Sequence, residues 1–209
     1  MGIETEAVFA HHYTPATLDG LKDQLAQRLD AAPFYDAYRG LLAAFEMDAA
    51  LTVFEQSRND PWTWHTSRDS ALSHLDPGHV VEIWQNEQDS LYLRGPCQFR
   101  LRIMPHCVIE PGPRWRNFLT DPPIQHIFRD HWSRLAAALG SPGAVYLPDS
   151  SYPISAASDM IYDGCSWDEF AARLHTTYGP PATTLGQVMT DYDGNHWFCD
   201  TFSKVESLQ

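Results

Sequence analysis

Serine, aspartate and histidine residues around one predicted strand, Ala144 to Leu147, are the residues best placed to do chemistry in this chain. The loop after the strand begins Asp149-Ser150-Ser151, and sites are often built on loops that follow strands. A serine nucleophile there would need a general base, which His196 or His175 would have to supply from a distant part of the chain. In this alternative the chain is a small soluble enzyme such as a hydrolase. Its candidate catalytic residues are Asp149, Ser150, Asp159 and His196.

A structural role is the favoured interpretation of these serines. Asp149 and Ser151 are residue types whose side chains bond to the backbone of a turn. Ser166, in Gly-Cys-Ser-Trp-Asp, is predicted to cap a helix, because the second glycine of a nucleophile elbow is missing. Turn capping and helix capping therefore explain these residues without a catalytic role.

The sequence predicts no metal site and no cofactor. Asp191-x-Asp193-Gly194-Asn195 has oxygen ligands like those of a calcium loop, but its glycine comes two positions early. Phe202 also occupies the place of the bidentate glutamate, so the segment is predicted to be a hairpin turn. The histidines and cysteines lack the spacing of a zinc site, and glycine-rich phosphate loops are absent from the sequence.

A group of arginines in the middle of the chain is the candidate site for an anion. Arg100 and Arg102 alternate along a predicted strand, and Arg114 and Arg116 follow in a predicted loop. Together they could grip a carboxylate, a phosphate or a single-stranded base. Because acid-rich segments flank the group on both sides, neutralisation of those acids is the favoured explanation.

Length and composition indicate a globular protein with a strong acidic bias. The 209 residues are 44% hydrophobic and 12% aromatic, with a formal net charge of -13. This length and this apolar content favour a single domain spanning residues 1–209. The four cysteines are widely separated and are predicted to be reduced and structural. The sequence lacks a signal-peptide pattern and any apolar run near the roughly 20 residues that span a membrane, so we expect a cytoplasmic protein.

The charges are unevenly distributed along the chain. Residues 1–93 hold fifteen acids and five bases, residues 94–134 hold three and seven, and residues 135–209 hold nine and two. Such an acidic balance repels nucleic-acid phosphate and favours a basic protein as partner. Neither a nucleic acid nor a membrane is therefore expected as a ligand.

One helix is specified in detail between Gly164 and Gly179. Ser166 and Glu169 have the spacing of a capping box, and Cys165 and Phe170 can pack as a hydrophobic staple. Gly179 provides a left-handed end, and two prolines after it prevent continuation. The apolar face of this helix is predicted to be Trp167, Phe170, Ala171, Leu174 and Tyr178.

Other elements follow from hydrophobic periodicity and from turn residues. The predicted helices are 14–29, 34–47 and 122–139, the last capped by Asp121 and ended by Gly140. The predicted strands are 3–10, a hairpin of 80–85 with 90–94, 97–104, 144–147 and a terminal hairpin of 188–192 with 196–202. Residues 50–55 are predicted to be helix or strand, residues 60–77 irregular with a short element, and residues 110–123 and 148–163 loops.

Together these elements predict an α+β fold. We expect a mainly antiparallel sheet of roughly five to seven strands with helices packed chiefly on one face. The favoured function is a non-catalytic acidic protein-binding domain, most concretely a bacterial immunity protein that neutralises a basic cognate toxin. Oligomeric state and family are not indicated by any motif. The expected partner-binding residues are Trp62, Trp64, Asp149, Asp159, Asp163, Asp191 and Asp193.

Overall fold

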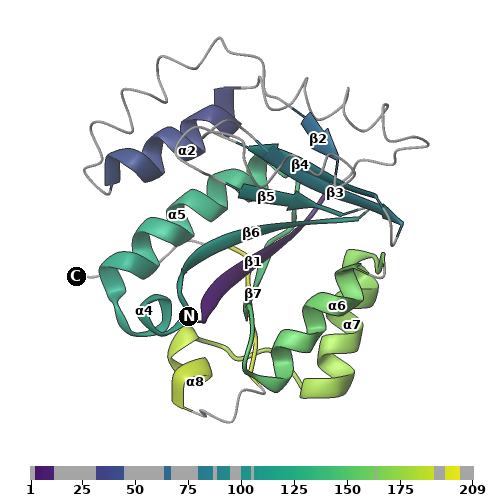
Figure 1. Cartoon of the computed structure of the whole chain (residues 1–209). Helices are drawn as coiled ribbons and strands as arrows, with labels where there is room; N and C mark the ends of the chain where they lie inside the picture. The colour runs from purple at the N-terminus through teal and green to yellow at the C-terminus, as the bar shows by residue number, and fades with distance from the viewer. Residues whose placement is uncertain are drawn as a thin grey trace.

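The computed structural model describes most of the C-terminal half of the chain and separate segments of the N-terminal half (Figure 1). The described residues are 3–11, 32–44, 64–66, 80–86, 89–94, 100–104, 106–162, 164–190 and 196–202. The predicted helix 14–29, residues 50–55 and the predicted turn at 193–195 lie outside them.

The described strands form one eight-stranded sheet in the order β2-β4-β3-β5-β6-β1-β7-β8. Their bounds are β1 Glu4–Ala10, β2 Trp64–Thr66, β3 Val80–Asn86, β4 Asp89–Arg94, β5 Arg100–Ile103, β6 Cys107–Arg114, β7 Ala144–Pro148 and β8 Phe198–Asp200. Neighbouring strands pair antiparallel except β3 and β5, which are parallel, and β4 also pairs with β5. The predicted strands at 3–10 and 144–147 and the hairpin of β3 and β4 are confirmed. The sheet has one strand more than the largest number expected.

β1 lies between β6 and β7 and pairs with both. Residues Thr5 to Ala10 are all buried, although neighbouring side chains in a strand point to opposite faces. Both faces of this part of the sheet are therefore covered.

One face carries the layer that we call the α5 layer, made of α2 (Ala32–Ala44), α4 (Trp115–Thr120) and α5 (Pro122–Leu139) (Figure 1). α5 begins as predicted, because the Asp121 side chain accepts a hydrogen bond from the Ile124 amide at 3.2 Å. It ends at Gly140, which has a left-handed φ of 71°. Its Trp132 ring packs against Tyr146 of β7 with ring centroids 4.8 Å apart. The core on this face is therefore aromatic.

Gly112 of β6 is fitted to this aromatic core. A Cβ atom at this position would lie 2.6 Å from Cζ2 of Trp132, closer than side chains can approach. Trp132 can approach the strand this closely because Gly112 has no side chain.

The opposite face carries the layer that we call the α6–α7 layer, made of the 3-10 helix η4 (Pro153–Ala156), α6 (Ala157–Tyr162) and α7 (Trp167–Tyr178) (Figure 1). The capping box of α7 is present: Ser166 Oγ accepts from the Glu169 amide at 3.3 Å, and Glu169 Oε2 accepts from the Ser166 amide at 3.0 Å. The side chains that α7 turns to the sheet, Phe170 and Leu174, are fully buried. Its predicted cap, apolar face and glycine end are thus confirmed.

The α+β class and the mainly antiparallel sheet are confirmed. The longest helix, α5, lies on the same face as α2 and α4, and the α6–α7 layer is a second, smaller covering that was not predicted. α8 (Leu185–Thr190) contacts α4. None of the described helices is both long and apolar enough to cross a membrane.

The predicted loop 110–123 is wrong, because β6 runs to Arg114 and α4 follows at once. Pro111 and Pro113 suggested a loop, since proline cannot donate to a sheet ladder. Among the described residues, however, β5 pairs with β6 only at Val108 and Ile109. The prolines lie beyond that point, and on the side of β1 the register is irregular there, with a shift between Glu4 and Glu6, which is opposite Pro111.

The predicted loop 148–163 is wrong in its second half, which forms η4 and α6. Ile154, Ala157 and Ile161 are buried at positions three and four residues apart, as on one helical face. Small polar residues between them obscured this spacing.

The predicted terminal hairpin is also wrong. Val188 lies in α8, and β8 pairs with β7. α8 has a capping box that was missed: the Gln187 amide donates to Thr184 Oγ1 at 3.3 Å, and Gln187 Oε1 accepts from the Thr184 amide at 3.3 Å. This reciprocal pair favours a helix over the strand predicted there.

Candidate functional site

The loop after β7 holds the first candidate residues, and its polar groups hold the turn together. The Asp149 amide donates to the Glu4 carbonyl at 2.9 Å, and the Glu4 amide donates to Asp149 Oδ1 at 2.9 Å. The Ser150 hydroxyl donates to the same Oδ1 at 3.1 Å. Ser151 has a left-handed φ of 70°. The Asp149 side chain thus bonds to β1 and to Ser150 rather than to the backbone of its own turn, and it fixes the start of β1 to the end of β7.

One of the candidate histidines, His196, comes two residues before β8. β8 pairs with β7, the strand that ends just before Asp149, and the pairing at this end stops at Tyr146 and Phe198. Asp159 lies separately, exposed in the first turn of α6, and His175 is exposed near the end of α7. The four candidate catalytic residues therefore do not all share one element or one loop.

The four candidate anion-binding arginines form two separate pairs. Arg100 and Arg102 lie on one face of β5, because they are two residues apart in a strand. Arg102 is opposite Ile109 of β6, and Arg114 lies about 16 Å further along that strand, at roughly 3.3 Å per residue. Arg114 and Arg116 are both exposed, at the end of β6 and in α4. The two pairs therefore lie on different elements, β5 for the first and the end of β6 with α4 for the second.

The candidate partner-binding residues are only partly described. Trp62, Asp163, Asp191 and Asp193 lie outside the described residues, and Trp64 is placed in β2 by its backbone alone. Asp149 and Asp159 are both exposed, as a binding role requires.

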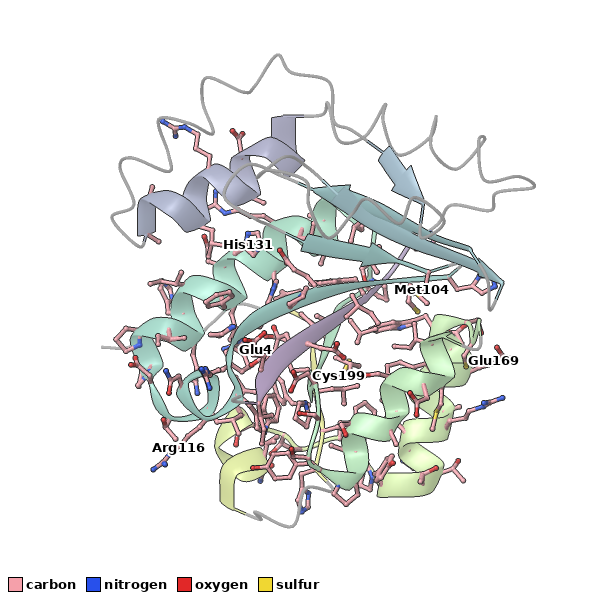
Figure 2. The ribbon with its side chains drawn as sticks, viewed as in Figure 1. Glu4, Met104, Arg116, His131, Glu169 and Cys199 are labelled. Atoms are coloured by element: carbon pink, nitrogen blue, oxygen red, sulfur yellow. The ribbon has the colours of Figure 1, made fainter. Side chains whose placement is uncertain are left out.

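The sequence analysis missed a buried polar contact that connects both α5 and α2 to the sheet. His131 of α5 is 1% exposed, and its Nδ1 lies 3.0 Å from the carbonyl oxygen of Ala37 in α2. Its Nε2 lies 3.0 and 3.1 Å from the two carboxylate oxygens of Glu110 in β6. Figure 2 shows His131 where α5 faces α2. The signal was a histidine three residues after Phe128 and four before Leu135 in the predicted helix 122–139, because a histidine on an apolar helix face requires a hydrogen-bond partner.

The chemistry of this contact is structural. A carbonyl oxygen only accepts hydrogen bonds, so Nδ1 donates to Ala37 and Nε2 faces the carboxylate of Glu110. Burial lowers the pKa of His131, but the charge of Glu110 and the hydrogen bonds to Glu110 and Ala37 raise it more, so the pKa lies above its ordinary value. Since both ring nitrogens already have protein partners, neither can serve a substrate.

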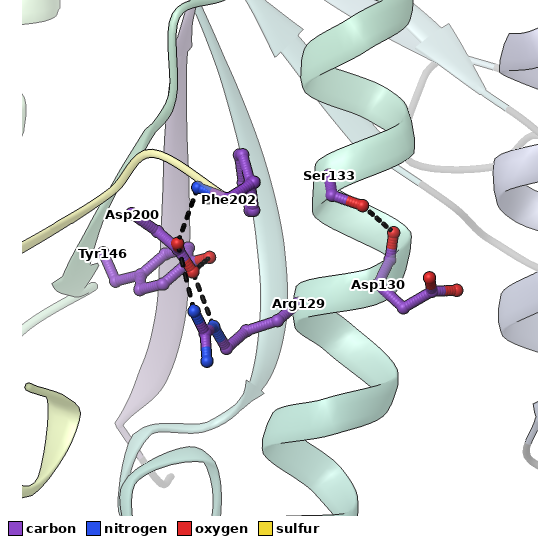
Figure 3. Close-up of polar contacts among 6 residues, drawn as sticks. All are labelled: Arg129, Asp130, Ser133, Tyr146, Asp200 and Phe202. Carbon is purple, nitrogen blue, oxygen red and sulfur yellow. Dashed lines mark hydrogen bonds and ion pairs between the residues drawn. The ribbon is translucent and has the colours of Figure 1, made fainter. Parts of the chain in front are cut away.

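A second missed contact fastens β8 to α5 (Figure 3). Asp200 is 2% exposed and accepts hydrogen bonds from Arg129 Nε at 2.6 Å and Nη2 at 3.1 Å. It also accepts from the Tyr146 hydroxyl at 2.9 Å and from the Phe202 amide at 2.9 Å. The hydrogen bond to Asp200 raises the pKa of Arg129, and burial raises the pKa of Tyr146 well above its ordinary value. With four donors, this carboxylate is satisfied by the fold itself.

The described cysteines are free thiols, as predicted. Cys107 lies in the core of the α6–α7 layer, where burial and the neighbouring Cys165 raise its pKa to about 12. Cys199 in β8 also has a pKa raised by burial. At neutral pH these groups are protonated and therefore poor nucleophiles.

Within the described parts of the chain, histidines, cysteines and acids do not gather into a group of three or more that could hold a metal ion. The buried polar groups at Asp200 and His131 instead connect the sheet to its helices.

Comparison of the chain with models of protein families, with curated proteins and with solved structures gave no match.

Proposed function

We propose that this chain is a non-catalytic acidic protein that binds a basic protein, most concretely a bacterial immunity protein that neutralises a cognate toxin in the cytoplasm. The observation that carries the proposal is the charge of the segment from the end of β7 to the end of α7. Residues 149–178 include five carboxylates and one arginine, a formal charge of -4. The described carboxylates of this segment, Asp149, Asp159, Asp168 and Glu169, are all exposed.

The use of the candidate catalytic groups supports the same proposal. The Ser150 hydroxyl donates its hydrogen bond to Asp149 Oδ1, which also accepts one from the Glu4 amide. A serine nucleophile instead donates to a histidine that can remove the proton. An acidic surface, by contrast, needs no such geometry to attract a basic protein and to accelerate its association.

The proposal is tested in cells by co-expression with the products of the neighbouring genes. We expect one neighbour to be toxic when expressed alone, and this chain to restore growth and to co-purify with it. The association rate should fall steeply as salt is raised from about 0.05 to 0.5 M, because exposed charges are screened at high salt. If no neighbouring product is toxic, or if the toxic product is neither bound nor neutralised, the proposal is wrong.

The enzyme alternative has one specific observation in its favour, which is that β8, the strand two residues after His196, pairs with β7, the strand just before Asp149 and Ser150. It predicts that the purified chain hydrolyses simple activated esters and that Ser150→Ala abolishes this turnover. Equal rates for the wild-type chain, Ser150→Ala and a buffer blank would eliminate it.

A further inference from the structure

The two helical layers carry opposite charge. α2 and residues 114–140 together hold five arginines and three carboxylates, a formal charge of +2, or +1 when Asp200, the buried partner of Arg129, is included, whereas residues 149–178 have a formal charge of -4. In the first group the bases are Arg39, Arg114, Arg116, Arg129 and Arg134, and the acids are Asp36, Asp121 and Asp130. The sheet separates the two groups (Figure 1). A basic partner is therefore attracted to one side of the molecule and repelled from the other.

The negative side also carries rings and a thioether that the fold covers only in part. Tyr152, Met160, Trp167 and Tyr178 pack against the core of the α6–α7 layer and are partly buried, so part of each side chain remains exposed. Tyr178 donates its hydroxyl to the Pro153 carbonyl at 3.0 Å, which fixes its ring beside the start of η4. The Trp167 ring centroid is 6.3 Å from that of Phe170. These rings are held in place before any partner arrives.

Aromatic and methionine side chains at a surface, surrounded by charge, have the composition of a protein-binding site. Trp167 is directly followed by Asp168 and Glu169, both exposed in the first turn of α7. Figure 2 shows Glu169 on α7, on the outer side of this layer. Hydrogen bonds from the backbone and side chain of Ser166 lower the pKa of Glu169, so it stays ionised. Asp168 and Glu169 thus place negative charge in the same helical turn as Trp167, and a cation near that turn would be attracted by this charge and by the ring.

We infer that the outer face of the α6–α7 layer, with Trp167, Asp168 and Asp159 as its main contacts, is where a basic protein docks through arginine or lysine side chains. This inference rests on the proposed function and names the surface that performs it. Arginine suits the site because its flat guanidinium can stack on a ring and pair with a carboxylate at the same time.

The test uses an arginine-rich peptide of about 12 residues as the probe, with fluorescence titration for affinity and amide chemical shifts for location. The test variant is Asp159→Lys with Asp168→Lys. The matched control is Asp36→Lys with Asp130→Lys, which makes the same change of charge at two exposed positions of the α5 layer. Circular dichroism and melting temperature verify that both variants remain folded.

We expect the test variant to lose about 10-fold or more in affinity for the peptide, and the control variant to lose much less, since nearby charges dominate when salt screens distant ones. Trp167→Ala should weaken binding by a further several-fold without changing its salt dependence. Shifts should concentrate on residues 157–178. An equal loss in both double variants, or shifts elsewhere, overturns the inference.

The same variants separate this inference from the proposed function. If the toxic neighbour is neutralised equally by the wild-type chain and by Asp159→Lys with Asp168→Lys, the function holds and the surface is wrong. If the peptide maps to the α6–α7 layer but no neighbouring product is bound, the surface holds and the immunity role is wrong.

Discussion

The two layers that cover the sheet are held in different ways. In the α5 layer, charged groups are buried and bonded within the protein, as Asp200 is to Arg129 and His131 is to Glu110. In the α6–α7 layer, contact with the sheet is made largely by apolar side chains such as Phe170 and Leu174, and the carboxylates of α7 remain on the outside. The difference separates two kinds of charged group: the buried ones, such as Asp200 and His131, fix α5 to the sheet, whereas the carboxylates of α7 are exposed to solvent.

The largest expected loss of stability follows from removing the Asp200 carboxylate, which fixes β8 to α5. Asp200→Ala removes the acceptor of Arg129 and leaves the buried Tyr146 hydroxyl without this partner. We expect the free energy of unfolding to fall by about 3–5 kcal/mol, as when one partner of a buried ion pair is removed. Chemical denaturation of the wild-type chain and of Asp200→Ala measures this difference in the free energy of unfolding.

The control for this change is Asp130→Ala in the same layer. Asp130 pairs with Arg134 at 2.9 Å, but both side chains are about half exposed. This substitution should cost only about 0.2–1 kcal/mol. Similar losses in the two variants would show that the buried network is no stronger than a surface pair.

In the α6–α7 layer the equivalent test is the removal of apolar volume. Leu174→Ala deletes a fully buried side chain from a core shared with Val8 and Ile109. We expect a loss of about 2–5 kcal/mol from lost burial and a residual cavity. The exposed Thr177→Ala on the same helix should change the free energy of unfolding by less than about 0.5 kcal/mol. Tolerance of Leu174→Ala would mean that this layer contributes little to stability.

The two layers should also respond differently to pH. The pKa of His131 is raised, so the folded protein keeps a proton that the unfolded chain loses near pH 6.5. This contribution is complete below that pH and is lost as pH rises through the raised pKa. Between the two pKa values, stability should fall by up to about 1.4 kcal/mol per pH unit.

Melting curves of the wild-type chain and of His131→Gln from pH 6 to 10 check this expectation. The difference between them should shrink as pH rises, whereas the difference between the wild-type chain and Leu174→Ala should stay constant. A His131 difference that is independent of pH would show that Nε2 is not a proton donor in this range.

The sequence predicted local structure well where a few neighbouring residues determine it. The cap of α7 at Ser166, the start of α5 at Asp121 and the end of α5 at Gly140 each depend on residues within one helical turn. The strand β1 and the hairpin of β3 and β4 follow from alternation and a polar turn. Such patterns are local and can be read without the fold.

The contacts that join distant segments were not predictable in this way. Asp200 and Arg129 are 71 residues apart, and no spacing rule connects a strand at the end of the chain to the middle of a helix. The strand segment at Pro111 was missed because its tolerance of proline depends on how far the neighbouring strand extends. In the loop after β7, turn residues were recognised, but not the bond of Asp149 to Glu4 that closes it.

The smallest expected change in the free energy of unfolding comes from removing one of two buried hydroxyl groups, which lie on opposite faces of the sheet. Thr5 Oγ1 is buried without a hydrogen-bond partner among the described residues. The Nε1 of nearby Trp132 is also buried and has no partner among them. Ser158 of α6, in contrast, donates to the buried Glu6 carboxylate at 2.8 Å. Thr5→Val keeps the shape and removes only an unsatisfied group, so stability should stay constant or rise by about 1 kcal/mol. Ser158→Ala should lose about 1–3 kcal/mol by the same reasoning, because it deprives a buried charge of its donor. If denaturation shows that Thr5→Val is the more damaging change, the Thr5 hydroxyl has a partner such as a bound water, and the core of the α5 layer is more polar than its aromatic packing indicates.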